Sequence, residues 1–174
     1  SGRLNGDKAV GTLHTNLGVE LSLNKLGITL ERTDIGDHFV MEKMLKDNLL
    51  VGGEQSGHII LREFSNTGDG VLAGVVIAKL IKTSGQSLHA LNDCMRFPQT
   101  NLNITTANKT KIMEDKGVLA LVEEIKTQLG ADGRVMLRAS GTEPKIRIMV
   151  EANQKETADT LATIIKDYIT KNLL

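Results

Sequence analysis

Residues 135–150, VMLRASGTEPKIRIMV, contain two apolar runs separated by a short polar segment. Such runs predict two strands, and residues 138–144 between them predict the loop that joins the strands. An arginine at a strand end can bind two phosphate oxygens at once, and the hydroxyl groups and the glycine that follow it also suit an anion. The segment therefore predicts a phosphate site, although a polar hairpin tip with Ser and Thr present by chance has the same composition.

The composition of the whole chain argues against several classes of partner. The 174 residues carry 21 Lys and Arg against 21 Asp and Glu, so the formal net charge is zero. A balanced charge and an aromatic content of 2% argue against nucleic acid or a membrane surface as a partner. The lone Cys94 fits a reducing compartment, and there is no signal peptide or apolar segment long enough to cross a bilayer. The sequence therefore predicts a cytoplasmic protein.

The first half of the chain predicts alternating strands and helices. A helix is expected after Asn16, and Asp37 is expected to cap a second helix that buries Leu45 in its apolar stripe. This order is typical of an α/β layer with helices packed on a largely parallel sheet. The expected strands are residues 8–13, 28–33 and 49–51, and a fourth is expected over residues 58–61.

A glycine-rich polar segment, residues 52–58, follows the third of these strands. Ligand loops in α/β sheets lie beyond the carboxyl ends of the strands. Glu54, Gln55 and Ser56 offer both hydrogen-bond acceptors and donors, which is what the hydroxyl groups of a sugar require. A polar turn explains the same residues without a ligand, and His58 suits packing or capping as well as binding.

The pattern changes around Pro98, where we expect a domain boundary between residues 1–95 and residues 99–174. The second part predicts a strand, a helix, two strands and a helix. This order is typical of a small α+β domain with its helices on one face of a mostly antiparallel sheet.

Two details of the second part are specific enough to test. Residues 107–116 are polar and predict a connection without regular structure. Asn153 is expected to cap the final helix, with Glu156 completing a capping box.

Taken together, the two loops resemble those of the phosphohexomutase family. Residues 53–58, GEQSGH, look like the sugar-recognition loop of the family's third domain, and residues 138–144, RASGTEP, look like the phosphate-binding loop of its fourth. The order of the loops also matches, so the resemblance covers essentially the whole chain. It implies a mixed-sheet α/β domain followed by a small TBP-like α+β domain, β-α-β-β-α.

The resemblance also assigns roles to individual residues. Gln55 and Gly141 stand where members that act on glucose or mannose phosphates usually carry Met and Asn. This favours the members that interconvert glucosamine 6-phosphate and glucosamine 1-phosphate. The residues implied to bind the sugar are Glu54, Gln55, Ser56 and His58, and those implied to bind phosphate are Arg138, Ser140, Gly141, Thr142 and Arg147.

The family's reaction needs parts that this sequence lacks. Its members transfer phosphoryl groups through a phosphoserine in a first domain, with Mg²⁺ held by an aspartate-rich loop in a second and a sugar bisphosphate as activator. Neither a Ser-His-Asn nor an Asp-Gly-Asp loop occurs here. We therefore expect the C-terminal part of a longer enzyme, which binds no metal and is inactive without its N-terminal domains. The alternatives are a non-catalytic phosphosugar-binding module and a mutase for glucose or mannose phosphates.

Overall fold

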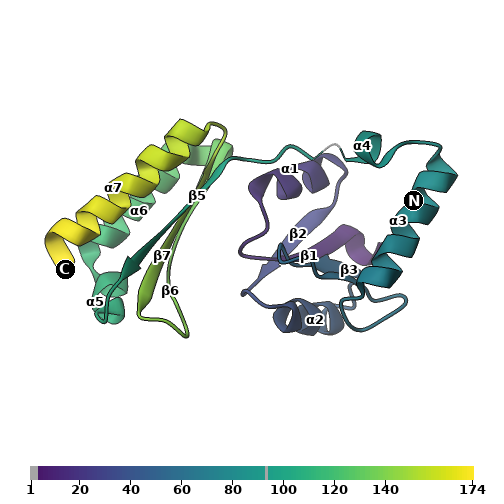
Figure 1. Ribbon diagram of the computed structural model, residues 1–174, viewed down its shortest axis with the longest axis horizontal. Coiled ribbons are helices and arrows are strands. Elements are labelled where there is room, and N and C mark those ends of the chain that lie inside the picture. Colours follow the sequence, from purple (N-terminus) through teal and green to yellow (C-terminus); the bar gives the residue numbers. More distant parts are fainter. Residues whose placement is uncertain (1–3, 93) are drawn as a thin grey trace. The chain divides into compact units, whose positions relative to one another are not determined.

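The computed structural model describes residues 4–92 and 94–174, and the chain divides into two compact units between Arg96 and Phe97 (Figure 1). The first unit contains η1 (Asn5–Asp7), β1 (Lys8–Thr12), α1 (Leu17–Lys25), β2 (Thr29–Thr33), α2 (Asp37–Lys46), β3 (Val51–Gly53), β4 (Ile59–Leu61), α3 (Gly70–Ser84) and α4 (Leu88–Leu91). The second contains β5 (Gln99–Thr105), α5 (Lys109–Glu114), α6 (Lys116–Leu129), η2 (Gly130–Asp132), β6 (Gly133–Ala139), β7 (Lys145–Ala152) and α7 (Lys155–Leu173).

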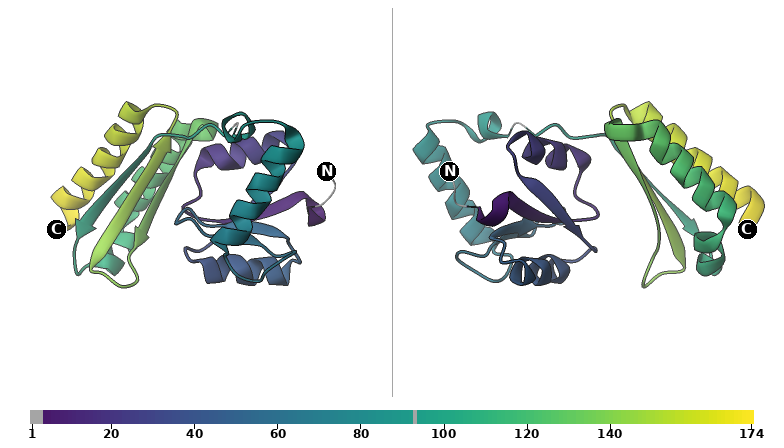
Figure 2. Two further views of the ribbon diagram at one scale, coloured as in Figure 1. Left: turned by 45° about the vertical axis from the view of Figure 1, so that its right-hand side comes forward. Right: turned by 180° about the vertical axis from the view of Figure 1, so that it is seen from behind.

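The first unit is built on a mixed sheet with the strand order β2-β1-β3-β4. β1 pairs in parallel with both β2 and β3, whereas β3 and β4 form an antiparallel hairpin. α1 and α2 cover opposite faces of the sheet (Figures 1 and 2). The two crossovers run in opposite directions along the sheet, and right-handed connections then place their helices on opposite faces. The mixed α/β architecture expected from the sequence is confirmed.

The core of this unit lies between the sheet and α2. It contains Val10 of β1, Val40 and Met44 of α2, Leu49 and Ile60.

α2 approaches the sheet closely because β3 carries a glycine at the contact. A Cβ atom at Gly52 would lie 2.5 Å from Sδ of Met44 and 2.8 Å from Cγ1 of Val40.

Two expectations for α2 are wrong. The residue that caps the helix is Gly36, and Asp37 is the first helical residue, with no side-chain capping hydrogen bond. Gly36 has a φ of 139°, a backbone conformation that favours glycine, so the chain turns into the helix one residue earlier than the acidic side chain suggested. Leu45 is 53% exposed, because it lies about 100° around the helix from Met44 and away from the core.

α3 is an apolar helix that buries little of its surface within the described chain. Asp69 caps it by accepting a hydrogen bond from the Leu72 N–H, and Gly85 ends it in the left-handed conformation, both as capping rules suggest. Its one buried residue is Ala73, whereas Val71 is 80% and Val75 62% exposed. None of the described helices is long and apolar enough to cross a membrane.

The second unit is an antiparallel sheet of order β5-β7-β6, with α6 and α7 on one face (Figure 2). Along the central strand, Ile146, Ile148 and Val150 are buried in the core with α6 and α7. Alternation in a strand therefore places Arg147, between them, on the opposite face. The α+β architecture is confirmed.

Two local expectations for this unit are wrong. Within residues 107–116 the chain forms α5, because Ile112 is fully buried in the core and Met113 packs against it, and both stabilise this short helix. The N-cap of α7 is Gln154, without a side-chain capping bond. Asn153 lies one residue outside the helix, where its N–H donates to the Asp132 carbonyl at 3.1 Å.

Candidate functional site

Residues 140–144 form a tight loop between β6 and β7. Its ends are joined by a hydrogen bond from the Ser140 N–H to the Lys145 carbonyl at 2.8 Å. The Ser140 side chain is buried, and its Oγ accepts a hydrogen bond from the Glu143 N–H at 3.3 Å. The Ser140 hydroxyl therefore holds the loop's shape, in addition to any role toward a ligand.

The loop's carbonyl groups and N–H groups are used unequally. The ammonium group of Lys109 donates to the Ser140 carbonyl at 2.7 Å and to the Glu143 carbonyl at 3.2 Å. The Pro144 carbonyl accepts from the Thr106 N–H at 2.8 Å. Within the described part of the chain, no acceptor is recorded for the N–H groups of Gly141 and Thr142, and both residues are exposed. Consecutive open N–H groups of this kind can bind an anion.

The backbone conformation of Gly141 is one that other residues can also adopt. Its φ is not positive, and a Cβ atom placed on it would meet nothing within 4 Å. The absent side chain instead leaves open space at this position of the loop, which a ligand could occupy.

Two arginines lie directly opposite each other beside this loop. Arg138 of β6 and Arg147 of β7 are register partners in the antiparallel pair. Arg147 donates from Nη2 to Glu143 Oε2 at 2.6 Å, whereas its buried Nε has no hydrogen-bond partner within the described chain. Lys145 donates to the other Glu143 oxygen at 2.7 Å. Chiefly through the hydrogen bond from Lys145, these cations lower the pKa of Glu143.

The second candidate loop, residues 53–58, connects β3 and β4. The backbone closes with the Glu54 N–H donating to the His58 carbonyl at 2.9 Å, and Gly57 turns with a φ of 103°. Gly57 is thus a position where glycine is required by the conformation.

Three side chains of this loop form one hydrogen-bonded chain. The Ser56 hydroxyl donates to Glu54 Oε2 at 2.7 Å and contacts His58 Nδ1 at 2.9 Å. A hydroxyl carries one hydrogen, so with that hydrogen on Glu54 the Nδ1 of His58 must be the donor to Ser56. Gln55 is exposed and takes no part in the chain. The loop thus presents Glu54, Ser56 and His58 as one unit.

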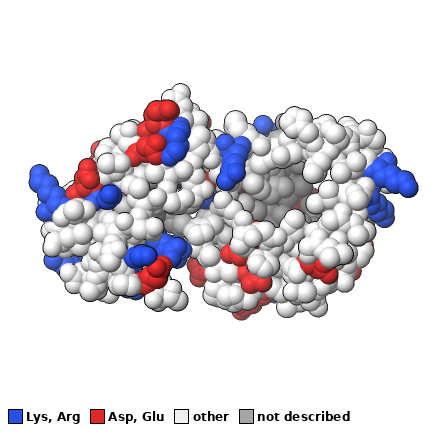
Figure 3. Space-filling model, in the orientation of Figure 1, with Lys and Arg blue, Asp and Glu red and all other residues white. Residues whose placement is uncertain are grey.

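A cavity of about 690 Å³ in the first unit opens beside this loop. Val10, Val19 and Leu23 form part of its apolar lining, and Glu54 and His58 also line it. Charged residues are sparse on the face of the first unit seen in Figure 3. Residues 53–58 thus place three polar side chains, Glu54, Gln55 and His58, in the lining of this cavity.

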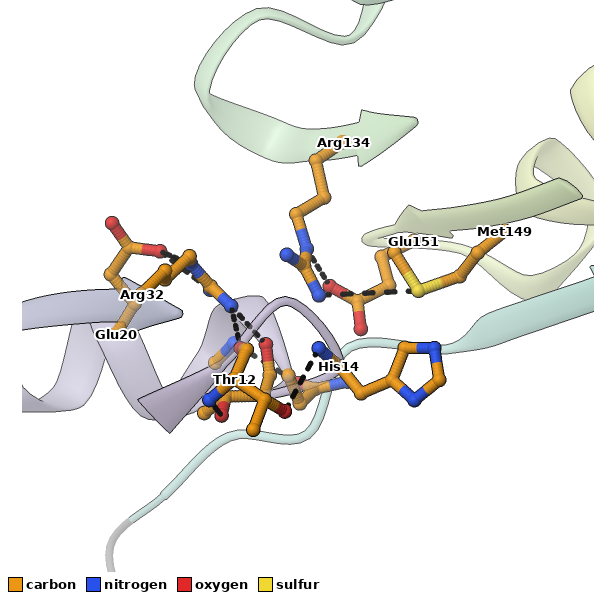
Figure 4. A network of polar contacts seen from close by, with 10 residues as sticks. Thr12, His14, Glu20, Arg32, Arg134, Met149 and Glu151 are labelled. Atoms are coloured by element: carbon orange, nitrogen blue, oxygen red, sulfur yellow. Dashed lines mark hydrogen bonds and ion pairs between the residues drawn. The ribbon is translucent and has the colours of Figure 1, made fainter. Parts of the chain in front are cut away.

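Two further arginines make structural contacts, each within its own unit (Figure 4). In the first unit, Arg32 binds Glu20 Oε2 at 2.7 Å through Nη2 and donates from Nη1 to the carbonyls of Thr12 and Thr15. It thereby fixes the turn between β1 and α1.

In the second unit, Arg134 pairs with the buried carboxylate of Glu151 at 2.6 Å. A buried carboxylate needs such a cation, so we assign Arg134 a structural role. Among the described residues, no group of three or more His, Cys, Asp or Glu side chains is placed to hold a metal ion.

Comparison with known families matches both units. Residues 1–97 match the family model for phosphoglucomutase/phosphomannomutase alpha/beta/alpha domain III, and residues 102–167 match the model for the phosphoglucomutase/phosphomannomutase C-terminal domain.

Curated relatives resemble the chain over almost its whole length. It is 41% identical over 169 residues to the phosphoglucosamine mutase of Bacillus velezensis, an alignment that covers 97% of this chain and 38% of the relative. It is 42% identical over 171 residues to the phosphoglucosamine mutase of Natranaerobius thermophilus, covering 98% of this chain and 39% of the relative. The chain thus spans less than two fifths of the length of these relatives.

Solved structures share the fold at lower identity. An Aspergillus fumigatus N-acetylphosphoglucosamine mutase superposes with a TM-score of 0.80 at 18% identity, covering 94% of this chain and 38% of that one. The Aspergillus fumigatus enzyme in complex with GlcNAc-6P and magnesium superposes with a TM-score of 0.77 at 18% identity, covering 97% of this chain and 42% of that one.

Proposed function

Because the chain belongs to the phosphoglucomutase/phosphomannomutase family, we propose that it is the phosphosugar-binding part of a phosphoglucosamine mutase. The reaction would interconvert glucosamine 6-phosphate and glucosamine 1-phosphate through a phosphoserine and a sugar bisphosphate. In this proposal residues 1–95 carry the sugar loop and residues 99–174 carry the phosphate loop. The relatives' shared name and the Gln55 and Gly141 positions favour glucosamine over glucose or mannose.

One observation carries the proposal. In residues 140–144 the carbonyl groups of Ser140 and Glu143 are held by Lys109, while the N–H groups of Gly141 and Thr142 remain open. Arg138 and Arg147 face each other on the adjoining strands. Backbone donors beside paired guanidinium groups suit a dianionic phosphate.

In this proposal the two loops bind different parts of the substrate. Arg138, Arg147 and the N–H groups of the phosphate loop would bind the phosphate that is not reacting. Glu54, Ser56 and His58 would hydrogen-bond the sugar hydroxyl groups in either orientation of the bisphosphate. Anchoring the distant phosphate positions the reacting one, and positioning supplies much of the rate in phosphoryl transfer.

The serine nucleophile and Mg²⁺ belong outside the described residues in this proposal. No cluster among those residues fits a metal ion, so no step of the reaction is assigned to a metal held by them. The magnesium and the bisphosphate would act in the longer protein, together with its N-terminal domains.

Calorimetric titration with glucosamine 6-phosphate tests the proposal. Arg138→Ala removes a charge-assisted contact worth about 1.5–3 kcal/mol, which corresponds to roughly a 10- to 150-fold loss of affinity. Lys126→Ala, which removes an exposed cation of α6, is the charge-matched control and should bind like the parent. If folded Arg138→Ala binds as tightly as the parent, the loop is only a turn and the proposal is wrong.

A further inference from the structure

We propose that Lys109 is a positioning residue for phosphate binding, which orients the Gly141 N–H toward the anion by holding the carbonyl oxygen at the opposite end of the same peptide unit. The inference rests on the proposed phosphate role of residues 140–144. Lys109 lies on α5, 31 residues before Ser140, and belongs to neither loop motif. Sequence reasoning placed it in an irregular connection and gave it no role.

Lys109 acts on the loop through one peptide bond, the one between Ser140 and Gly141. The carbonyl of Ser140 and the N–H of Gly141 belong to the same planar trans unit, so they point in opposite directions. The Lys109 ammonium holds that carbonyl at 2.7 Å. Holding this carbonyl therefore fixes the Gly141 N–H on the side of the peptide unit that faces away from Lys109.

The second contact of Lys109 fixes the other end of the loop. The same ammonium group holds the Glu143 carbonyl at 3.2 Å, so one cation joins both ends of a short segment. The Glu143 carbonyl shares its peptide unit with the nitrogen of Pro144, which has no N–H, so this second contact orients no further donor. The loop's peptide units are therefore held by contacts on the side of α5.

Lys109 also strengthens the donor that it aims. A cation bound to a carbonyl oxygen draws electron density through the amide, and linked hydrogen bonds polarise one another. The Gly141 N–H thus becomes a better donor to an anion, although the ammonium group itself is already bound to two carbonyl oxygens. This role differs from direct charge attraction, which any nearby lysine could supply.

The neighbouring Lys111 provides a matched control. It lies on the same short helix, carries the same charge and is exposed. Lys109→Met and Lys111→Met each remove one ammonium group and keep a long side chain. Lys109→Arg keeps donors for the two carbonyls and should restore most of the function.

The experiment combines calorimetry and amide NMR on the 174-residue chain, with inorganic phosphate and glucosamine 6-phosphate as probes. We expect Lys109→Met to weaken binding of both by roughly tenfold, equivalent to about 1.4 kcal/mol. Lys111→Met should bind as the parent does. At saturating phosphate, the downfield shift of the Gly141 amide proton should be reduced in Lys109→Met and restored in Lys109→Arg.

The possible outcomes separate this inference from the proposed function. If the parent binds phosphate in an Arg138-dependent way and Lys109→Met retains both its affinity and its Gly141 shift, the positioning role is wrong and the proposed function stands. If the parent binds neither probe, both are wrong. If Lys109→Met does not fold, as judged by circular dichroism, Lys109→Arg decides: a folded Lys109→Arg that lacks the Gly141 shift overturns the inference.

Discussion

Arg138 and Arg147 are direct cross-strand partners in the β6–β7 hairpin, next to the loop that joins the two strands. Like charges placed opposite each other destabilise a strand pair. Glu143 offsets part of this repulsion through its contact with Arg147 at 2.6 Å, but it is shared with Lys145. Residues 138–147 thus carry three cations, Arg138, Lys145 and Arg147, against the one carboxylate of Glu143, a composition that favours a bound anion.

This relationship predicts that phosphate stabilises the chain against thermal unfolding. A ligand at one hundred times its Kd adds about 2.7 kcal/mol to the stability of the state that binds it. Arg147→Ala should change stability by less than about 0.5 kcal/mol without phosphate, since it relieves repulsion and loses a half-exposed ion pair, but it should reduce the phosphate-induced rise in Tm. Sodium chloride at equal ionic strength controls for screening. An equal rise with chloride would contradict a specific site.

The sugar loop predicts a different selectivity. Glu54→Ala should weaken binding of glucosamine 6-phosphate by roughly 2- to 10-fold, because it loses one hydrogen-bonding group toward ring hydroxyls, and should leave inorganic phosphate binding unchanged. Calorimetric titration with both ligands checks this. Arg138→Ala provides the contrast, since it should weaken both. Loss of phosphate binding in Glu54→Ala would mean that the loop does not act on the sugar.

The lowered pKa of Glu143 predicts how stability changes with pH. A carboxyl whose pKa is lower in the folded state stabilises the fold fully above its unfolded pKa, near 4.5, and loses this contribution as the pH falls through the folded value. The Tm of the parent should therefore exceed that of Glu143→Gln near neutral pH, and the difference should shrink below pH 4.5. The control is Glu124→Gln on α6, where the residue is exposed. A difference that is constant with pH would exclude the ionic contribution of Glu143.

Two glycines predict opposite effects of the same substitution. Gly52→Ala should destabilise the first unit by about 1–3 kcal/mol, because the new Cβ would overlap Met44 and Val40. Gly74→Ala on α3 meets nothing within 4 Å and should stabilise by about 0.5–1 kcal/mol, since alanine favours a helix interior. Urea unfolding followed by circular dichroism measures both. A stable Gly52→Ala would show that α2 can shift away from β3.

The chain by itself is expected to have no mutase activity, because its sequence contains neither the nucleophile loop nor the metal loop of the family. Glucosamine 6-phosphate, a sugar bisphosphate and Mg²⁺ would be incubated with it, and glucosamine 1-phosphate would be measured. The heat-treated chain is the control. Turnover above that control would require a nucleophile among the 174 residues that sequence reasoning missed.

Local patterns in the sequence were sufficient to predict both architectures. The alternation of Ile146, Ile148 and Val150 places one face of β7 in the core, and this depends only on the period of a strand. Asp69 and Gly85 bound α3 for equally local reasons. The loops between strands could be located in the same way, whereas the binding roles of their residues stay predictions.

Contacts between distant residues were decided only by the tertiary structure. α5 forms where the sequence predicted a connection, because Ile112 is buried by helices and strands that are remote in sequence. Leu45 is exposed because no described element packs on its side of α2.

The same distinction applies at the phosphate loop. The hydroxyls and the arginine of residues 138–144 can be read directly from the sequence, but Lys109 becomes part of the loop only when α5 packs beside the hairpin. Arg138 and Arg147 become partners because the hairpin's register pairs them. Sequence determined which chemical groups this protein carries and the period of its strands and helices. The directions in which these chemical groups point and the partners that they bind were decided by tertiary packing, because a hydrogen bond depends on positions in space and not on separation along the chain.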